Sequence, residues 1–231
     1  MRAVAVIGAG YGDEGKGAAT DRLAATFGPR ALVVRHNGGA QAGHTVVAPD
    51  GRRHVFGHVG SGSFAEVATY LSAHFVASPI LCLRELAALE RLGVRPTLYV
   101  DAGCAVTTPY DMWVNQAIES ARSGARHGSC GVGFGETIER QGHAGFALSV
   151  ADLRAPARLH ERLAAIRRDW LAQRCAALGL DAPPDAIDGD GLMQRFLADC
   201  ARFVAAVEVC DAAVLRGRPL IFEGAQGLGL D

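Results

Sequence analysis

The sequence predicts an α/β fold in which a mostly parallel sheet is flanked by helices. Short apolar runs that suit buried strands alternate with amphipathic stretches that suit helices, and this alternation is typical of βαβ units. The first apolar run, residues 3–8, leads into a glycine cluster and then into a helical pattern. That order is typical of a strand, a phosphate-binding loop and a helix. We expect residues 1–231 to form a single domain.

The first half of the chain supplies most of the predicted strands. In chain order we expect a strand at 3–8, a helix at 15–27, a strand at 31–36, a glycine-rich loop at 37–44, strands at 45–48 and 53–56, a helix at 81–92 and a strand at 97–100. Pro49-Asp50-Gly51 is a turn signal, so the strands on either side of it should form a hairpin. Pro79 near the start and Gly93 at the end delimit the helix at 81–92.

The second half is predicted to be mostly helical. We expect helices at 111–122, 157–178 and 192–215, a loop at 123–145 and a buried strand at 219–222. Seven glycines between residues 123 and 145 favour the loop. The chain stops at Asp231, in a glycine-rich segment directly after the last strand. Ligands usually sit at such strand ends, so this is an unusual place for a domain to finish, and we expect a C-terminal part to be missing.

Composition excludes several classes of function. The chain has 23 basic and 24 acidic residues and a net charge of −1, which gives no basic field for nucleic acid. No apolar run is long enough to span a bilayer, and no secretory signal follows Met1. The six cysteines contain no C-x-x-C pair, so they are interpreted as reduced thiols and not as a disulfide frame or a zinc site. We therefore expect a cytoplasmic protein without nucleic-acid or membrane partners.

The glycine cluster at residues 8–17 carries two acids, Asp13 and Glu14. Two carboxylates beside a phosphate would repel it unless a cation or a proton transfer links them. Gly10, Gly15 and Lys16 match most of a P-loop, but Gly17 stands where Ser or Thr should bind magnesium. Another group must then hold a metal, and Asp13 is the nearest candidate. The loop therefore suggests a nucleotide, a metal and chemistry together.

The same cluster also permits other interpretations. Gly10, Gly12 and Gly15 match the dinucleotide fingerprint, and Arg35, directly after the second strand, could suit the 2′-phosphate of NADP. Cofactor binding that depends on Arg35 but not on magnesium would identify that oxidoreductase. A glycine-rich turn without a ligand is the remaining alternative.

A second glycine-rich segment, residues 37–45, follows the second predicted strand. It should therefore face the same edge of the sheet as the first loop. His44 is its one titratable group, and a loop histidine alone is more often structural. With Asp13 across the same edge, an acid–base pair becomes plausible.

Three ordered motifs resemble adenylosuccinate synthetase. They are Asp13-Glu14-Gly15-Lys16-Gly17, the segment from Asn37-Gly38-Gly39 to Ala42-Gly43-His44-Thr45, and Phe222-Glu223-Gly224-Ala225-Gln226-Gly227. Ser78-Pro79 before the helix at 81–92 also resembles that family. The likeness covers essentially the whole chain, and three ordered motifs are far more specific than one glycine loop.

The resemblance implies a homodimeric ligase of purine nucleotide biosynthesis. Such an enzyme joins L-aspartate to the 6-position of IMP with GTP hydrolysis and Mg²⁺, through a 6-phosphoryl intermediate. The resemblance also implies roles for single residues. Asp13 would be the base and a magnesium ligand, His44 the acid, and the Gly43 carbonyl a second magnesium ligand. Gln226 would bond the purine near its 6-oxygen. The groups that would cradle the GTP phosphates are those of Gly12, Asp13, Glu14, Gly15, Lys16 and Gly17.

The chain departs from the family on the side of the acceptor nucleotide. The family holds the 5′-phosphate of IMP with a Thr-Thr-Gly segment, where this chain has Ser129, Cys130 and a glycine. Gln41 replaces a family asparagine that contacts nucleotide. The family arginine that reaches across the dimer has no clear counterpart, and Arg140 is the best match. We expect Gln41, Ser129, Cys130 and Arg140 to bind nucleotide.

Two alternatives for function stay open, one from these departures and one from the abrupt end at Asp231. A related ligase could act on dGMP, as in the phage-type 2-aminoadenylosuccinate synthetases, although retention of Asp13 favours the inosinic substrate. A non-catalytic nucleotide-binding fragment is the other alternative. The family's guanine-recognition residues lie beyond position 231, so the choice of GTP over ATP rests on the family alone.

Overall fold

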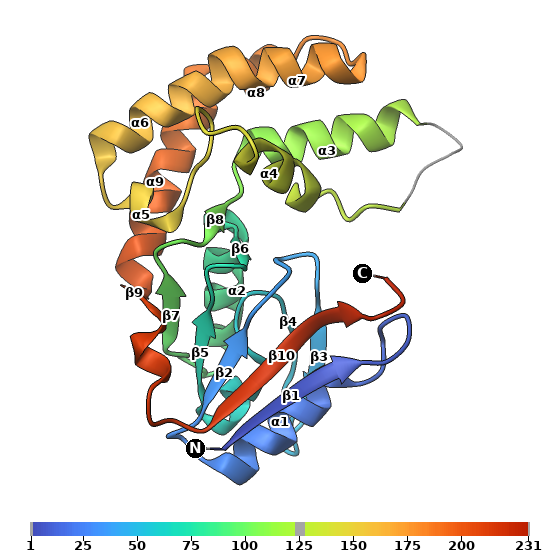
Figure 1. Ribbon diagram of the computed structural model, residues 1–231, viewed down its shortest axis with the longest axis vertical. Coiled ribbons are helices and arrows are strands. Elements are labelled where there is room, and N and C mark those ends of the chain that lie inside the picture. The colour runs from blue at the N-terminus through green and yellow to red at the C-terminus, as the bar shows by residue number, and fades with distance from the viewer. Residues whose placement is uncertain (1, 123–127, 231) are drawn as a thin grey trace.

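The computed structural model describes residues 2–122 and 128–230, and its centre is a six-stranded sheet (Figure 1). In spatial order the strands are β1 (Ala3–Gly8), β10 (Leu220–Gly227), β2 (Leu32–Arg35), β5 (Ala68–Leu71), β7 (Leu98–Asp101) and β9 (Glu208–Cys210). All five pairings between neighbours are parallel. The α/β fold with a mostly parallel sheet is thereby confirmed.

Two smaller pairings lie outside this sheet. β3 (His44–Val47) and β4 (Arg53–Phe56) form the antiparallel hairpin predicted around the turn at Pro49-Asp50-Gly51. β6 (Val76–Ala77) and β8 (Ala105–Val106) form a short parallel pair that sequence patterns did not indicate.

The helices cover the sheet and extend beyond one end of it. The α-helices are α1 (Lys16–Phe27), α2 (Pro79–Arg91), α3 (Pro109–Ala121), α4 (Phe134–Gln141), α5 (Val150–Leu153), α6 (Pro156–Ala165), α7 (Leu171–Leu178), α8 (Asp185–Asp188) and α9 (Asp190–Ala206). A π-helical segment, η3 (Ile166–Trp170), joins α6 to α7, and 3₁₀ turns lie at η1 (Ser61–Ala65) and η4 (Ala212–Leu215). Figure 1 shows α3, α4, α6 and α7 gathered above the sheet, with α9 leading back toward it.

Apolar clusters on both faces hold the sheet in place. On one face, Val33 and Ile221 pack with Ala24 of α1 and with Val67 after η1. On the other face, strands β2, β5 and β10 pack against η4. The largest cluster lies under the helical end and joins α3, α6, α7 and α9 to β7. No helix in residues 2–122 and 128–230 is long and apolar enough to cross a membrane.

Local signals fix the starts of α2 and α3. Ser78 accepts a hydrogen bond from the Leu81 N–H and caps α2, with Pro79 as its first residue. Thr108 and Asp111 form a capping box in which the Thr108 N–H donates to the Asp111 carboxylate at 2.7 Å. The helix predicted at 81–92 therefore exists and begins two residues earlier.

The structure corrects three predictions. The helix predicted at 192–215 ends at Ala206, because the following residues form β9 on the outer edge of β7. The loop predicted at 123–145 contains α4, and its residues 123–127 lie outside the described chain. The strand predicted at 219–222 continues to Gly227, because β2 pairs with it as far as Glu223 and β1 pairs with it as far as Gly227.

Candidate functional site

Three segments meet in a cleft of about 430 Å³ where β1, β2 and β10 end. They are the loop between β1 and α1, the segment that leads into β3, and the end of β10. Of the residues predicted from sequence, the cleft is lined by Gly12, Asp13, Glu14, Gly15, Lys16, Gly17, Gln41, Gly43, His44 and Gln226. A larger cavity of about 580 Å³, lined by α6, α7 and α9, contains none of them.

The first loop turns sharply before α1. Gly12, Asp13 and Gly15 all adopt left-handed backbone conformations, with φ of 96°, 51° and 81°. Gly15 caps α1 without a side-chain hydrogen bond, so the first N–H groups of the helix have no side-chain cap. The N-terminal end of a helix attracts anions, and the buried Lys16 adds a positive charge there. The loop can therefore bind a phosphate.

Gly17 explains why this loop departs from the P-loop pattern. A Cβ atom at position 17 would lie 2.9 Å from the Thr45 carbonyl oxygen and 3.1 Å from the His44 Cβ. Such approaches are too close, so the first turn of α1 contacts β3 only because residue 17 has no side chain. The serine or threonine of a P-loop would push His44 away from the loop.

His44 is held at the cleft by two acceptors on β10. Its Nδ1 lies 2.7 Å from Glu223 Oε1, and its Nε2 lies 3.1 Å from the Ala225 carbonyl oxygen. The ring is buried, with 6% of its surface exposed. Both ring nitrogens thus face acceptors, an arrangement that is fully satisfied when both carry a hydrogen. The ring is oriented by groups 179 and 181 residues away in the sequence.

Glu223 is a fully buried carboxylate at the centre of this arrangement. Besides His44, it accepts hydrogen bonds from the Ser61 N–H at 3.1 Å and from the Ser61 hydroxyl. Arg35 Nη1 lies 3.8 Å from its other oxygen. Burial raises the pKa of Glu223, but the hydrogen bond from His44 and the charge of Arg35 outweigh burial, so its pKa is below the ordinary value.

Sequence reasoning named Glu223 only as part of a motif and assigned it no role. The available signal was its position, because an acid within an apolar run of residues is costly to bury without partners. Its partners come from β2, η1 and β3, which are separate in sequence.

Arg35 does not face the cleft. Its side chain is fully buried, pairs with Glu223 and stacks over the Phe75 ring at 5.5 Å. A guanidinium without an exposed face cannot bind the 2′-phosphate of NADP. The alternative interpretation as an NADP-binding oxidoreductase therefore loses its anchoring residue.

Gln41 and Gln226 reach the cleft from opposite segments. The Gln41 Oε1 atom is buried and has no hydrogen-bond partner among the described residues. The Asn37 side chain accepts a hydrogen bond from the Ala225 N–H at 3.2 Å and so ties the second segment to β10. The side-chain amides of Gln41 and Gln226 therefore have hydrogen-bonding capacity left for a ligand.

Ser129 and Cys130 do not line this cleft. Their segment is fastened to α3, where Asn115 exchanges hydrogen bonds with the Ser129 hydroxyl and accepts one from the Gly133 N–H at 3.1 Å. The two regions meet nearby, since a Cβ at Gly39 would lie 3.1 Å from the Phe134 ring. Gln41 thus lines the cleft, whereas Ser129 and Cys130 lie outside it.

The family model for adenylosuccinate synthetase matches residues 5–231. This chain belongs to the adenylosuccinate synthetase family. Among relatives of that name, the protein from Gloeobacter violaceus is 34% identical over 242 residues, which cover 100% of this chain and 52% of the relative. The protein from Neisseria gonorrhoeae is 34% identical over 233 residues, with 99% and 52% coverage. The chain thus spans about half the length of the curated relatives it matches.

Solved structures support the fold. Fully ligated adenylosuccinate synthetase from Plasmodium falciparum superposes with a TM-score of 0.76 at 17% identity, over 98% of this chain and 52% of that one. The succinoaminodeoxyadenylate synthetase (PurZ) of cyanophage S-2L, bound to dGMP and dATP, gives a TM-score of 0.57 at 21% identity, over 100% and 53%. At these identities the likeness shows the fold alone.

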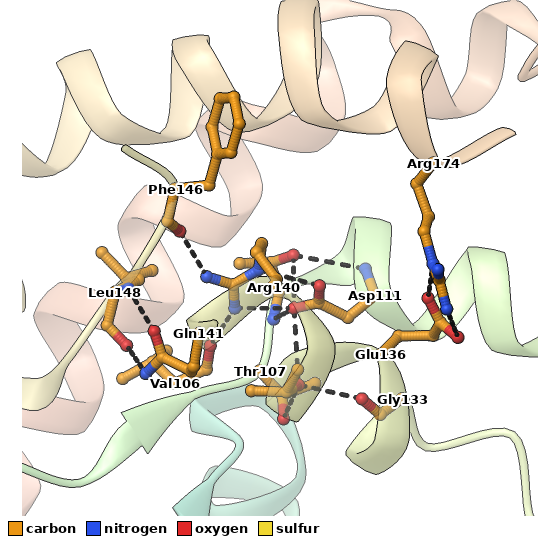
Figure 2. A network of polar contacts seen from close by, with 12 residues as sticks. Val106, Thr107, Asp111, Gly133, Glu136, Arg140, Gln141, Phe146, Leu148 and Arg174 are labelled. Atoms are coloured by element: carbon orange, nitrogen blue, oxygen red, sulfur yellow. Dashed lines mark hydrogen bonds and ion pairs between the residues drawn. The ribbon is translucent and has the colours of Figure 1, made fainter. Parts of the chain in front are cut away.

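Arg140 does not fit the family arginine that reaches across a dimer. Its side chain is fully buried, and its Nε and Nη2 bind the two oxygens of Asp111, each at 2.9 Å (Figure 2). Two further donors go to the Phe146 and Val106 carbonyls at 2.7 and 2.6 Å. A guanidinium committed to four internal bonds cannot contact a nucleotide on a partner, so this prediction is wrong.

The same network fastens α4 to its surroundings. The Thr137 hydroxyl lies 2.8 Å from the Thr107 hydroxyl, and Gln141 exchanges two hydrogen bonds with the backbone of Leu148 (Figure 2). Arg174 of α7 forms a bidentate pair with Glu136 at 2.8 and 3.1 Å. Arg140 therefore serves to position helices in this member of the adenylosuccinate synthetase family.

A further buried acid, Glu85, supports the hairpin beside the cleft. It accepts hydrogen bonds from the N–H groups of Gly57 and His58 at 2.9 and 2.7 Å. The side chains of His54 and His58 lie 3.6 and 3.5 Å away. Burial raises the pKa of Glu85, but the nearby side chains of His54 and His58 prevail and lower the pKa to about 2. Sequence reasoning did not single out this residue.

The donor set at the cleft fits magnesium. Asp13 has an exposed carboxylate, and Gly43 is exposed in the facing segment. Within residues 2–122 and 128–230, no cluster of three His, Cys, Asp or Glu side chains could hold a metal. Mg²⁺ commonly takes one or two protein oxygens and completes its shell with phosphates and water, which needs no such cluster.

Proposed function

We propose that this chain provides the nucleotide-binding and phosphoryl-transfer part of a ligase that joins L-aspartate to the 6-position of IMP with GTP. The observation that carries the proposal is the cleft itself. It brings the loop with Asp13 and Lys16 against His44, whose ring is fixed by a buried carboxylate. A phosphate site beside a fixed histidine suits phosphoryl transfer, in which positioning and electrostatic stabilisation dominate.

In this proposal the loop binds the GTP phosphates. The N–H groups at the start of α1 and the Lys16 ammonium would hold the β- and γ-phosphates. Asp13 and the Gly43 carbonyl would hold Mg²⁺, which supplies charge neutralisation for the transferring phosphoryl group. Asp13, exposed at the cleft, would also take the proton from N1 of IMP. The 6-oxygen then becomes nucleophilic enough to accept the phosphoryl group.

His44 would stabilise charge on the phosphoryl group and the 6-oxygen. To do so its Nε2–H must leave the Ala225 carbonyl and turn toward the ligand. The Nδ1 contact with Glu223 can persist through that change and keeps the ring oriented. The aspartate amine would then displace the phosphate from the purine, with Gln226 bonded near the 6-position.

Two observations favour a second candidate with dGMP as the acceptor. Gln41 replaces the family asparagine, and its Oε1 atom has no partner among the described residues. The cyanophage structure with the same fold was solved with dGMP and dATP bound. Because the chain spans half the length of its relatives, a third candidate is a nucleotide-binding protein without turnover.

Phosphate release in the presence of Mg²⁺ and L-aspartate tests the proposal. GTP and ATP would each be paired with IMP and dGMP as acceptors. We expect aspartate-dependent release with GTP and IMP, and its loss in Asp13→Asn but not in Asp50→Asn, an exposed acid of the hairpin turn. Release with dGMP in place of IMP would support the second candidate, and nucleotide binding without release would support the third. Release that is independent of aspartate contradicts all three.

A further inference from the structure

Glu14 folds back across its own loop. Its Oε1 accepts a hydrogen bond from the Gly10 N–H at 2.7 Å. Its Oε2 lies against Gly8, so closely that a Cβ atom at that position would collide with it. The carboxylate thus reaches back from the start of α1 toward the end of β1, although Glu14 as a whole residue is exposed.

Lys16 approaches the same place from the other side. A Cβ atom at Gly8 would lie 3.0 Å from the Lys16 Nζ. The lysine is buried, with 6% exposed, yet its ammonium has no hydrogen bond or ion pair among the residues that the structure describes. The carboxylate and the ammonium therefore flank one glycine without neutralising each other in a salt bridge.

These contacts are those that a phosphate makes in such a loop. An anion in a P-loop accepts from backbone N–H groups and lies within reach of the lysine. In this chain the Glu14 carboxylate already accepts from one N–H group and lies near the lysine. A phosphate and a carboxylate cannot share the position, because the two negative charges repel and the space is limited on one side by Gly8.

We propose that the Glu14 carboxylate stands in the phosphate position of the loop, so that a nucleotide phosphate binds only by displacing it. The inference rests on the proposed function, in which this loop binds the GTP phosphates. A ligand then binds only when its interactions with the loop are more favourable than those that the Glu14 carboxylate makes there. Asp13, its neighbour in the left-handed region, is exposed like Glu14 but takes no part in this contact.

Binding of inorganic pyrophosphate and of GTP, by isothermal titration calorimetry in EDTA, tests this proposal. Glu14→Ala empties the position and removes the charge, and Glu14→Gln removes the charge but can still accept from Gly10. We expect the dissociation constant to fall by about tenfold or more in Glu14→Ala and by less in Glu14→Gln. Glu90→Gln, an exposed acid on α2, should bind like the unaltered chain.

A second measurement follows the contact without any ligand. The amide signal of Gly10 in a proton–nitrogen correlation spectrum should shift in Glu14→Ala, which loses the hydrogen bond, and should keep its position in Glu90→Gln, which retains it. Pyrophosphate should move the Gly10 signal of the unaltered chain as it displaces Glu14.

Displacement of Glu14 and phosphate binding by the loop are tested by different outcomes. If the unaltered chain binds GTP and Glu14→Ala binds no more tightly, displacement is wrong and the proposed function stands. If neither chain binds GTP or pyrophosphate, and Lys16→Ala changes nothing, the loop is no phosphate site and both proposals are overturned. If affinity rises equally in Glu14→Ala and Glu14→Gln, charge repulsion alone explains the effect. The proposal that Glu14 occupies the phosphate position would then be wrong.

Discussion

At the scale of single residues, the cleft depends on the absence of one side chain as much as on the presence of others. Gly17 lets the first turn of α1 lie against His44 and Thr45. Its backbone is not in the left-handed region, so only the lack of space, and not strain, requires glycine there. The position of His44 relative to the phosphate loop is thus set by van der Waals contact.

The first prediction follows from that contact. Gly17→Ala should lower the free energy of unfolding by about 1–3 kcal/mol, because the methyl group overpacks against the Thr45 carbonyl. Urea denaturation measures the change. Gly135→Ala is the matched control: it lies in the first turn of α4 with nothing near its Cβ position, so it should be neutral or gain up to about 1 kcal/mol. Equal effects of the two substitutions would show that α1 and β3 do not make this close contact.

At the scale of elements, Glu85 ties the segment after β4 to α2. Its carboxylate accepts the N–H groups of Gly57 and His58, while the Ser78 N–H donates to His58 Nε2 at 2.9 Å. One side chain thus joins β4, the start of α2 and the residues that lead to η1. Loss of its charge should loosen that corner.

The second prediction concerns the pH dependence of stability. The pKa of Glu85 is lowered from 4.5 to about 2 in the folded chain, so its contribution is present above about pH 4.5 and is lost as the pH falls from there toward 2. That contribution is on the order of 2–3 kcal/mol. In urea titrations between pH 6 and 3, the stability gap between the unaltered chain and Glu85→Gln should narrow. A gap that is constant with pH would mean that Glu85 is not charged in the folded chain.

Elements also show where sequence patterns were sufficient and where they failed. The loop after β1, the hairpin and α2 were predicted because glycine, proline and turn residues act locally. β5, a central strand, was missed because Ala68–Leu71 is too short to show a period. β9 was taken for helix because Glu208–Cys210 becomes a strand only through its pairing with β7.

The residues of the candidate site also divide into those that local sequence patterns predict and those that such patterns miss. Ten predicted residues line one cleft, because residues that follow parallel strands meet at one edge of the sheet. Arg140 was misassigned because its partner Asp111 lies 29 residues earlier, and no local pattern reveals that pair. The roles of Glu223 and Glu85 were missed for the same reason, since a buried acid is recognised by partners that are distant in sequence.

At the scale of the whole molecule, one of the two edge strands of the sheet, β1, lies beside exposed apolar side chains. β1 pairs only with β10 among the described strands, and its Ile7 side chain is 61% exposed. Tyr11, Leu228 and Leu230 are also exposed, at 79%, 60% and 56%, and the backbone of Leu228 bonds to Gly8. An open strand edge next to exposed apolar side chains favours association with other chains.

The third prediction is that this chain, on its own, associates as its concentration rises. Ile7→Lys should weaken that association, because a charge on an edge strand opposes strand pairing. Light scattering coupled to size-exclusion chromatography measures the mass at several concentrations. Val47→Lys, which alters an equally exposed residue on β3, should leave the association unchanged. Association that is unaffected by Ile7→Lys would place the contact on another surface.

The strand order also determines when the cleft can form during synthesis. β10 (Leu220–Gly227) lies between β1 and β2, the first two strands of the chain. Until β10 has left the ribosome, β1 and β2 have no common neighbour and His44 lacks Glu223. Contacts of such long sequence separation form slowly, since loop closure must come first. A nascent chain therefore carries its phosphate loop without an oriented His44 until β10 inserts between β1 and β2.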